Sequence, residues 1–259
     1  MKRWTLLMGL MMVGGIVSAA VQTKEIEYKD GKTVLRGYLA FDNEVKGIRP
    51  GILVVHEWKG HGEYVRRRAR QLAEAGYVAF AIDMYGKGVF AKDHDEAAKL
   101  SGIYFQDRTL MRHRAQAGLK VFLKQPNVDP KRVAAIGYCF GGSTVLELAR
   151  AGTDLKGVAS FHGSLGTPVP AQSNTVKAKV IIFQGGDDSW SMGGVPAFQE
   201  EMNKAGVDWQ IVIYGGAVHS FTVKEAGNDP STGMAYNEKA DRRSWQALLD
   251  FLKSIFEAA

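Results

Sequence analysis

Residues 132–149 of the chain read RVAAIGYCFGGSTVLELA, and this stretch decides the fold. After Arg132, residues 133–137 form an apolar run of the kind found in buried strands, and a helical pattern covers residues 143–151. Between them stands Gly137-Tyr138-Cys139-Phe140-Gly141, a turn so sharp that side chains at its two glycine positions would clash. The stretch therefore predicts a strand that passes at Cys139 directly into a helix.

This turn gives Cys139 the position of a catalytic nucleophile. The arrangement resembles the Gly-x-nucleophile-x-Gly elbow of α/β-hydrolases, with cysteine in the place of the usual serine. It raises the sulfur above the sheet at the start of the helix, where the helix dipole and free N–H groups favour a thiolate. The alternative is a buried structural cysteine. Because Cys139 is the only cysteine, no disulfide within the chain and no cysteine-based metal site can form.

The rest of the chain alternates predicted strands and helices. Apolar runs typical of buried strands lie at residues 51–56, 77–82, 132–137, 157–161, 179–183 and 209–214. Helical patterns lie at 63–75, 94–124, 143–151 and 195–205, and in a last helix with Trp245, Leu248, Leu249, Leu252, Ile255 and Phe256 on one face. Two short alternating runs flank Asp30-Gly31 and predict a hairpin of residues 26–28 and 34–41. The sequence predicts one α/β domain over residues 21–259, with a mostly parallel sheet and helices on both faces.

Composition and charge narrow the classes of function. The 259 residues are 46% hydrophobic and 23% charged, which is typical of a folded globular domain. The net charge of +6 is not gathered in a tail, so no nucleic-acid partner is expected. Basic residues Arg66, Arg67, Arg68 and Arg70 are interpreted as a solvated helix face. His56 and His61 are five residues apart, one more than the zinc-binding helix motif requires, and neither a metal nor a cofactor is predicted.

Residues 1–20 have the pattern of a secretory signal peptide. Lys2 and Arg3 precede an apolar stretch that ends in Ser18-Ala19-Ala20. About thirteen apolar residues are too few for a permanent span, which needs ~20, although an uncleaved anchor is the alternative interpretation. The sequence predicts an exported protein, in a periplasm, with no stable membrane span after cleavage.

Two histidines follow Cys139, and in this fold the acid comes before the catalytic histidine. His219 lies in a glycine-rich loop directly after the strand at 209–214, whereas His162 comes too early and is interpreted as structural. The acid is Asp187 or Asp188, just past the strand at 179–183, and spacing does not distinguish them. Because parallel strands present their chemistry beyond their carboxyl ends, the three residues are expected to converge.

A further acidic residue, Glu57, follows the first buried strand, where hydrolases keep the second donor of their oxyanion hole. The backbone N–H groups of Trp58 and Phe140 are therefore predicted to hold a tetrahedral oxyanion. Glu57 is expected to lie close to Cys139 and to exchange its proton. The alternative interpretation of Glu57 is a solvated loop charge.

Together these residues resemble the dienelactone hydrolase (carboxymethylenebutenolidase) family. The resemblance covers nearly all of the chain after the first twenty residues, and its motifs are GYCFGG at 137–142, GGDD at 185–188 and HSF at 219–221. It implies an α/β-hydrolase fold and a Cys-Asp-His triad in which Asp188 is the acid. It also implies that Glu57 controls the ionisation of the thiol.

The resemblance also indicates a changed substrate. Asp83-Met84-Tyr85 is similar to a family segment that borders the pocket. The family's type member binds a substrate carboxylate with two arginines, and the corresponding positions hold Lys87 and Val223. Lysine keeps the charge without the bidentate fork, so a more apolar or differently charged ester is expected. The residues predicted to contact substrate are Tyr85, Lys87, Trp190 and Ser220, with Trp58, Trp190 and Phe140 as an aromatic wall.

The sequence as a whole predicts an exported, cofactor-free hydrolase of small esters, lactones or thioesters. Cys139 attacks the carbonyl, His219 shuttles the proton, Asp188 orients His219, and a covalent acyl-enzyme forms. One alternative is a non-catalytic binding or redox-responsive protein that keeps the fold and uses Cys139 as an oxidisable thiol. A second alternative is acyl transfer to a partner rather than to water.

Overall fold

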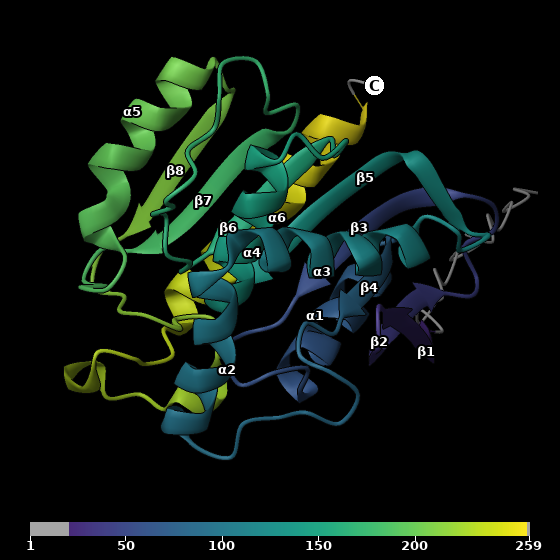
Figure 1. Cartoon of the computed structure of the whole chain (residues 1–259), viewed down its shortest axis with the longest axis horizontal. Helices are drawn as coiled ribbons and strands as arrows, with labels where there is room; N and C mark the ends of the chain where they lie inside the picture. Colours follow the sequence, from purple (N-terminus) through teal and green to yellow (C-terminus); the bar gives the residue numbers. More distant parts are fainter. Residues whose placement is uncertain (1–20, 258–259) are drawn as a thin grey trace, which may run out of the picture.

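The computed structural model describes residues 21–257, and within them one eight-stranded sheet is wrapped by helices (Figure 1). The strands are β1 (Val21–Asp30), β2 (Thr33–Asp42), β3 (Arg49–Val55), β4 (Val78–Ile82), β5 (Val128–Tyr138), β6 (Gly157–Phe161), β7 (Lys179–Gly185) and β8 (Trp209–Tyr214). The helices are α1 (Glu63–Glu74), α2 (His94–Gln106), α3 (Arg108–Phe122), α4 (Phe140–Arg150), α5 (Val195–Ala205) and α6 (Glu238–Glu257).

The sheet is mostly parallel, as the sequence predicts. Its strand order is β1-β2-β4-β3-β5-β6-β7-β8. Only the β1–β2 and β2–β4 pairs are antiparallel, and every pair from β4 to β8 is parallel. The carboxyl ends of β3, β5, β7 and β8 therefore open on the same edge of the sheet. This edge holds the loops that carry the candidate site.

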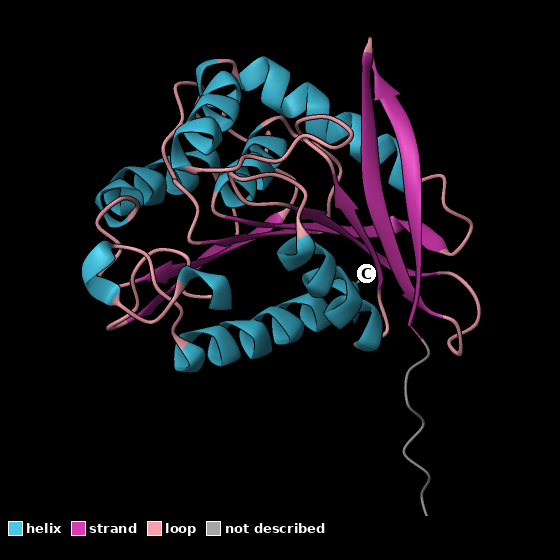
Figure 2. Ribbon diagram, turned by 90° about the horizontal axis from the view of Figure 1, so that it is seen from below, coloured by secondary structure: helices cyan, strands magenta, loops and turns pink. Residues whose placement is uncertain are grey.

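Helices cover both faces of the sheet (Figure 2). Helices α1 and α6 pack on one face, while α3, α4 and α5 pack on the other. The burial of β3 on both faces explains why its sequence does not alternate apolar and polar residues. Ile52 and Val54 pack into the core on the α1 side of the sheet, and Leu53 and Val55 pack into the core on the other side. A parallel strand buried on both faces must be apolar throughout.

Several element boundaries differ from those that the sequence predicts. The hairpin strands are longer, because β1 and β2 pair over their whole length from Val21↔Asp42 to Asp30↔Thr33. The predicted helix at 94–124 is two helices, since Asp107 ends α2 and its side chain accepts a hydrogen bond from the Leu110 N–H as the N-cap of α3. Helix α4 begins three residues earlier than predicted, immediately after Cys139.

The predicted signal peptide, residues 1–20, lies outside the described residues. Among residues 21–257, no helix is both long and apolar enough to span a membrane.

Candidate active site

The turn between β5 and α4 holds Cys139 in a backbone conformation that few non-glycine residues adopt. Its φ is 54° and its ψ is −114°, and its N–H donates to the Phe161 carbonyl at 2.9 Å. A side chain at Gly137 would place Cβ 2.0 Å from the Gly141 oxygen, and one at Gly141 would lie 2.2 Å from the Val55 oxygen. The two glycines of the motif are thus required by close packing, as the sequence predicts.

Cys139, His219 and Asp188 come together from three different loops. His219 Nε2 lies 3.2 Å from Cys139 Sγ, and His219 Nδ1 lies 2.8 Å from Asp188 Oδ2. His219 is 7% exposed and Asp188 only 1%, so water competes little for the hydrogen bond between them. The convergence that the sequence predicts at this edge of the sheet is therefore present.

The structure also distinguishes the two neighbouring aspartates. Asp188 is buried against His219, and its Oδ1 accepts a hydrogen bond from the Trp190 N–H at 3.0 Å. Asp187 is exposed, and its N–H donates to the Ala217 carbonyl at 2.9 Å. Of the two candidates that spacing leaves open, only Asp188 is placed to orient His219.

The charges of this group favour the protonated form of His219. Burial lowers the pKa of His219. The effects of Cys139 and Asp188, which face the ring from either side, are together larger and raise this pKa to about 10. Burial raises the pKa of Asp188, but the hydrogen bond from His219, the charge of His219 and smaller hydrogen-bond contributions together lower it below its usual value. Between the pKa values of Asp188 and His219, the ring is therefore a cation beside the Asp188 carboxylate.

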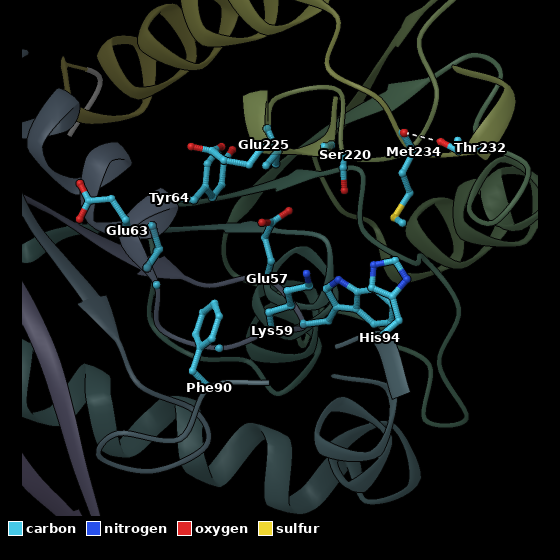
Figure 3. Close-up of a pocket in the computed structure, with 16 residues that line it drawn as sticks. Glu57, Lys59, Glu63, Tyr64, Phe90, His94, Ser220, Glu225, Thr232 and Met234 are labelled. Atoms are coloured by element: carbon cyan, nitrogen blue, oxygen red, sulfur yellow. Dashed lines mark hydrogen bonds between the residues drawn. The ribbon is translucent and has the colours of Figure 1, made fainter. Parts of the chain in front are cut away.

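Glu57 lies at the floor of a neighbouring cavity, and the structure shows no hydrogen bond from its carboxylate to Cys139 or to any other described residue. Burial raises its pKa to about 7, with an opposing effect from His219. Glu57 is therefore not a simple solvated charge. The Glu57 side chain points into the cavity (Figure 3), and its expected proton exchange with Cys139 stays a prediction.

The two predicted oxyanion donors have free N–H groups. The Phe140 amide is the first of α4 and, like that of Trp58, donates to no acceptor in the described chain. Tyr85 fixes this loop, because its hydroxyl donates to the Trp58 carbonyl at 2.9 Å. Buried His56 bonds the Glu57 carbonyl through Nδ1 at 2.6 Å, so its other nitrogen accepts from the Met84 N–H. Tyr85 thus holds the loop that carries Trp58 through its hydroxyl group.

A cavity of about 570 Å³ opens beside the triad, in the size range of small-molecule sites (Figure 3). It is mainly apolar, and it lies between the loop after β3, the start of α1 and the loop after His219. Its lining residues are Glu57, Trp58, Lys59, Gly60, Gly62, Glu63, Tyr64, Val65, Phe90, His94, Ser220, Val223, Glu225, Ala226, Thr232 and Met234.

The residues predicted to contact substrate separate into two groups. Ser220 lines the cavity with a φ of 56°, and the Trp190 ring packs edge-on against His219 with 5.1 Å between ring centres. Lys87 is not brought to the site: it is half-exposed and forms an ion pair with Glu27 on β1. Val223 lines the cavity as an apolar wall residue. Neither Lys87 nor Val223 therefore places a positive charge in the site.

The interpretation of the α1 arginines as a solvated face is wrong for Arg68. Its side chain is buried, forms an ion pair with Asp241 on α6 and donates to the Thr222 carbonyl at 3.0 Å. Arg68 lies three residues after Val65 and four before Leu72, which is the spacing of the buried stripe, and this signal could have identified it. The side chains of Arg66, Arg67 and Arg70 are half-buried and pair with Glu25, Glu225 and Glu63, respectively.

A buried hydrogen-bonded chain behind His219 was not predicted from the sequence. His162 Nε2 lies 2.8 Å from Thr222 Oγ1, which lies 2.6 Å from the Tyr64 hydroxyl. The His162 ring packs against His219 with 5.2 Å between ring centres. Three of the four described non-glycine residues with positive φ, Cys139, His162 and Ser220, belong to this region. Such strain persists only where the surroundings enforce it.

Possible metal ligands do not cluster in residues 21–257, where no three His, Cys, Asp or Glu side chains form a group suited to an ion.

The raised pKa values of Glu57 and His219 predict that these two groups contribute less to stability as pH rises. Glu57 takes up a proton on folding between its unfolded value of 4.5 and about 7, and His219 between 6.5 and about 10. Each contribution is complete below the lower value and is lost as pH rises through the higher one. Below about pH 6.5 the lowered pKa values of His56, His61 and His162 act in the opposite direction, so the test is made above that range. We expect the melting temperature to fall by several degrees from pH 7 to pH 10, and His219→Asn should remove most of this fall. A wild-type profile that is flat from pH 7 to pH 10 would contradict the assignment to His219.

A mostly parallel sheet with a strained nucleophile turn and an acid and a histidine at its carboxyl edge is the architecture of an α/β-hydrolase. The chain belongs to the dienelactone hydrolase family, whose sequence profile matches residues 35–256. It is thus a hydrolase of the family that the sequence motifs indicate.

Individual relatives agree with this assignment. A solved dienelactone hydrolase-like promiscuous phosphotriesterase from metagenomic libraries is 36% identical, with a TM-score of 0.86 over 92% of this chain and 100% of its own. A protein of Aquifex aeolicus provisionally named a carboxymethylenebutenolidase is 29% identical over 90% of this chain and 98% of its own. A structure from Klebsiella pneumoniae, 21% identical with a TM-score of 0.72 over 90% of this chain and 99% of its own, shares the fold.

Proposed function

We propose that this protein hydrolyses esters, lactones or thioesters through an acyl-enzyme on Cys139. The observation that carries the proposal is the position of His219, which lies 3.2 Å from the Cys139 sulfur and 2.8 Å from the Asp188 carboxylate. A histidine with an acid behind it and a nucleophile in front of it can take and return one proton in each half of an acyl transfer.

In the first half, the Cys139 thiolate attacks the carbonyl carbon and forms a carbon–sulfur bond. The carbonyl oxygen becomes an oxyanion within reach of the free N–H groups of Trp58 and Phe140, a contribution of about 3 kcal/mol per donor in such sites. As the tetrahedral intermediate collapses, the bond to the leaving group breaks. His219 gives its proton to the departing alkoxide or thiolate, and a thioester on Cys139 remains.

In the second half, neutral His219 takes a proton from water, and the hydroxide attacks the thioester carbonyl. The same two N–H groups hold the second oxyanion. When this intermediate collapses, the carbon–sulfur bond breaks and the carboxylic acid leaves. The thiolate is restored and His219 again carries its proton, with Asp188 stabilising the charged ring throughout.

The acyl-enzyme is the test of this proposal. Wild-type protein mixed with an aryl acetate or an aryl butyrate and quenched in acid within the first turnover should show one acyl group by intact mass. Peptide analysis should locate it on Cys139. An acyl group on any other residue would contradict the mechanism. Release of the aryl alcohol without an initial burst and without an adduct would contradict it as well.

A redox-responsive or binding role is the rival proposal, favoured only by the single thiol at the site. It requires reversible oxidation of Cys139 without turnover of any acyl substrate. A panel of substrates separates hydrolysis from a redox or binding role, and it should include a thioester, a lactone and a dienelactone. An acceptor alcohol added to the same assays would reveal acyl transfer to a partner. An aryl phosphotriester belongs in it because of the metagenomic relative described above.

We also propose that the protein is exported after removal of residues 1–20, on the strength of their charge and hydropathy pattern. N-terminal sequencing of the protein from a periplasmic fraction tests this, and a start at Met1 would contradict it.

A further inference from the structure

A chain of hydrogen bonds joins the wall of the cavity to the ring behind His219, and none of its atoms belongs to the triad. His162 Nε2 lies 2.8 Å from Thr222 Oγ1, which lies 2.6 Å from the Tyr64 hydroxyl. At the far end of the chain, Arg68 Nε donates to the Tyr64 oxygen at 3.2 Å. His162 is fully buried and Thr222 nearly so, and water therefore competes little for these bonds.

The donors of this chain fix the direction of its protons. The Arg68 guanidinium can only donate, so the Tyr64 oxygen accepts from it. The Tyr64 proton then has one acceptor among the described residues, Thr222 Oγ1, and the Thr222 proton goes on to His162 Nε2. The reverse direction would leave the Tyr64 proton without an acceptor in this part of the chain. His162 is therefore a neutral ring that carries its proton on Nδ1.

Thr222 is held by its backbone as well. Its carbonyl accepts from Nη2 of the Arg68 guanidinium at 3.0 Å, and the same guanidinium forms an ion pair with Asp241 on α6. The guanidinium carbon also lies 5.5 Å from the ring centre of Tyr138, the residue before Cys139. Both polar groups of Thr222 are thus tied to one buried cation, the carbonyl directly and the hydroxyl through the chain.

Thr222 lies three residues after His219, in a segment with an unusual backbone. Ser220 has a φ of 56°, and the Val223 N–H closes a turn onto the Ser220 carbonyl at 2.9 Å. A residue other than glycine keeps such a conformation only where its surroundings enforce it. The His162 ring packs against the His219 ring, with 5.2 Å between ring centres. Thr222 therefore holds both the segment that carries His219 and the ring behind it.

We propose that Thr222 is a positioning residue of the triad, whose hydroxyl holds the neutral His162 ring against His219. Without that hydroxyl the His219 ring can turn away from Cys139 and Asp188, which lie 3.2 and 2.8 Å from its two nitrogens. A reacting group displaced by about 1 Å can lose about 10²-fold in rate. This inference rests on the proposed hydrolysis for its effect on rate, but the arrangement of His219 can be measured without turnover.

Two substitutions at one position isolate the hydroxyl. Thr222→Val removes it at nearly the same volume, and Thr222→Ser keeps it. We expect Thr222→Val to lower kcat for an aryl acetate roughly ten-fold with little change in KM, and Thr222→Ser to keep most of the wild-type rate. Ser101→Ala is the control, because it removes another buried hydroxyl, one that donates to the Ala97 carbonyl within α2.

A spectroscopic titration needs no turnover and separates positioning from loss of stability. In protein labelled with ¹⁵N-histidine, the shifts of the ring nitrogens give the tautomer and the pKa of each of the six histidines. His162→Asn and His219→Asn assign the two signals of interest. Wild-type His162 should be neutral at neutral pH, with its proton on Nδ1. A charged His162 ring, or a proton on Nε2, would contradict the direction of the chain.

The pKa of His219 is the readout of its position. Burial lowers this pKa, and Cys139 and Asp188 raise it more, through contacts that depend on the orientation of the ring. Glu57 and His162 are the other titratable groups close to it. In the valine variant the pKa of His219 should fall by roughly one pH unit, whereas the serine variant and the control should keep the wild-type value.

The outcomes separate this inference from the proposed function. A lower pKa of His219 in Thr222→Val, with no ester turned over by the wild type, would uphold the positioning role and refute the hydrolysis. An unchanged pKa in folded Thr222→Val, or an equal fall in Ser101→Ala, would overturn the role of Thr222 whether or not an ester is hydrolysed. Where Thr222→Val does not fold, Tyr64→Phe decides, because it removes only the donor to Thr222; an unchanged pKa of His219 there would overturn the proposal.

Discussion

Replacement of Cys139 by alanine is expected to lower kcat/KM for every ester that the protein turns over by about 10⁴-fold or more. Removal of a catalytic nucleophile alone can cost nearly as much as removal of its whole triad, because the triad acts as one unit. The sulfur is the atom that forms the covalent bond, and no second thiol exists in the chain. Initial rates on an aryl acetate and an aryl butyrate, wild type beside variant, measure the effect.

The variant should remain folded, so the loss can be assigned to chemistry. Alanine is smaller than cysteine and keeps the backbone N–H that donates to the Phe161 carbonyl at 2.9 Å. Loss of the thiolate also removes one anion that faces His219, so the pKa of His219 should fall. Circular dichroism and the melting temperature provide the control. Turnover by Cys139→Ala at the wild-type rate would show that the reaction does not pass through the sulfur.

The parts of this site that the sequence predicts are those fixed by backbone geometry. A strand that turns at once into a helix requires glycine at 137 and 141, where a Cβ would meet backbone oxygens at 2.0 and 2.2 Å, so the motif carries its own structural meaning. The order of Cys139, acid and His219 follows from the order of parallel strands. Local pattern and topology therefore give the sheet, the elbow and the convergence of the triad.

The parts that the sequence does not predict depend on where side chains point. Adjacent residues after a strand differ in direction, so spacing alone leaves Asp187 and Asp188 open; the family resemblance implies Asp188, and the folded loop turns Asp188 to His219 and Asp187 to solvent. Lys87 is close in sequence to Tyr85, yet it turns to Glu27 on a strand that pairs with β2. Such partners are distant in the chain, and no local pattern signals them.

The cavity depends on loops in the same way. The loop after β3, the start of α1 and the segment around Glu225 form one wall only after folding, when Arg67 reaches Glu225 across 158 positions of the chain. Neither segment carries a local sequence pattern that signals the other.

Asp188→Asn is expected to lower kcat/KM by about 10³-fold or more with little change in the fold. The Trp190 N–H donates to Oδ1 at 3.0 Å and would keep the amide oxygen of asparagine at that position. The amide nitrogen would then face His219 Nδ1, where a donor meets a nitrogen that must itself donate. The ring would adopt the opposite tautomer, with its proton on Nε2 toward sulfur, and could no longer accept one there.

The same substitution should change the pH dependence as well as the rate. Without the carboxylate, the pKa of His219 should fall from about 10, so the ion pair with Cys139 would be lost at lower pH. The alkaline limb of the kcat/KM profile should move to lower pH accordingly. Asp187→Asn is the matched control, because it makes the same chemical change one residue away on an exposed side chain. If both variants lose activity equally, the assignment of the acid fails; if only Asp188→Asn does, the contact between Asp188 and His219 is the source of the effect.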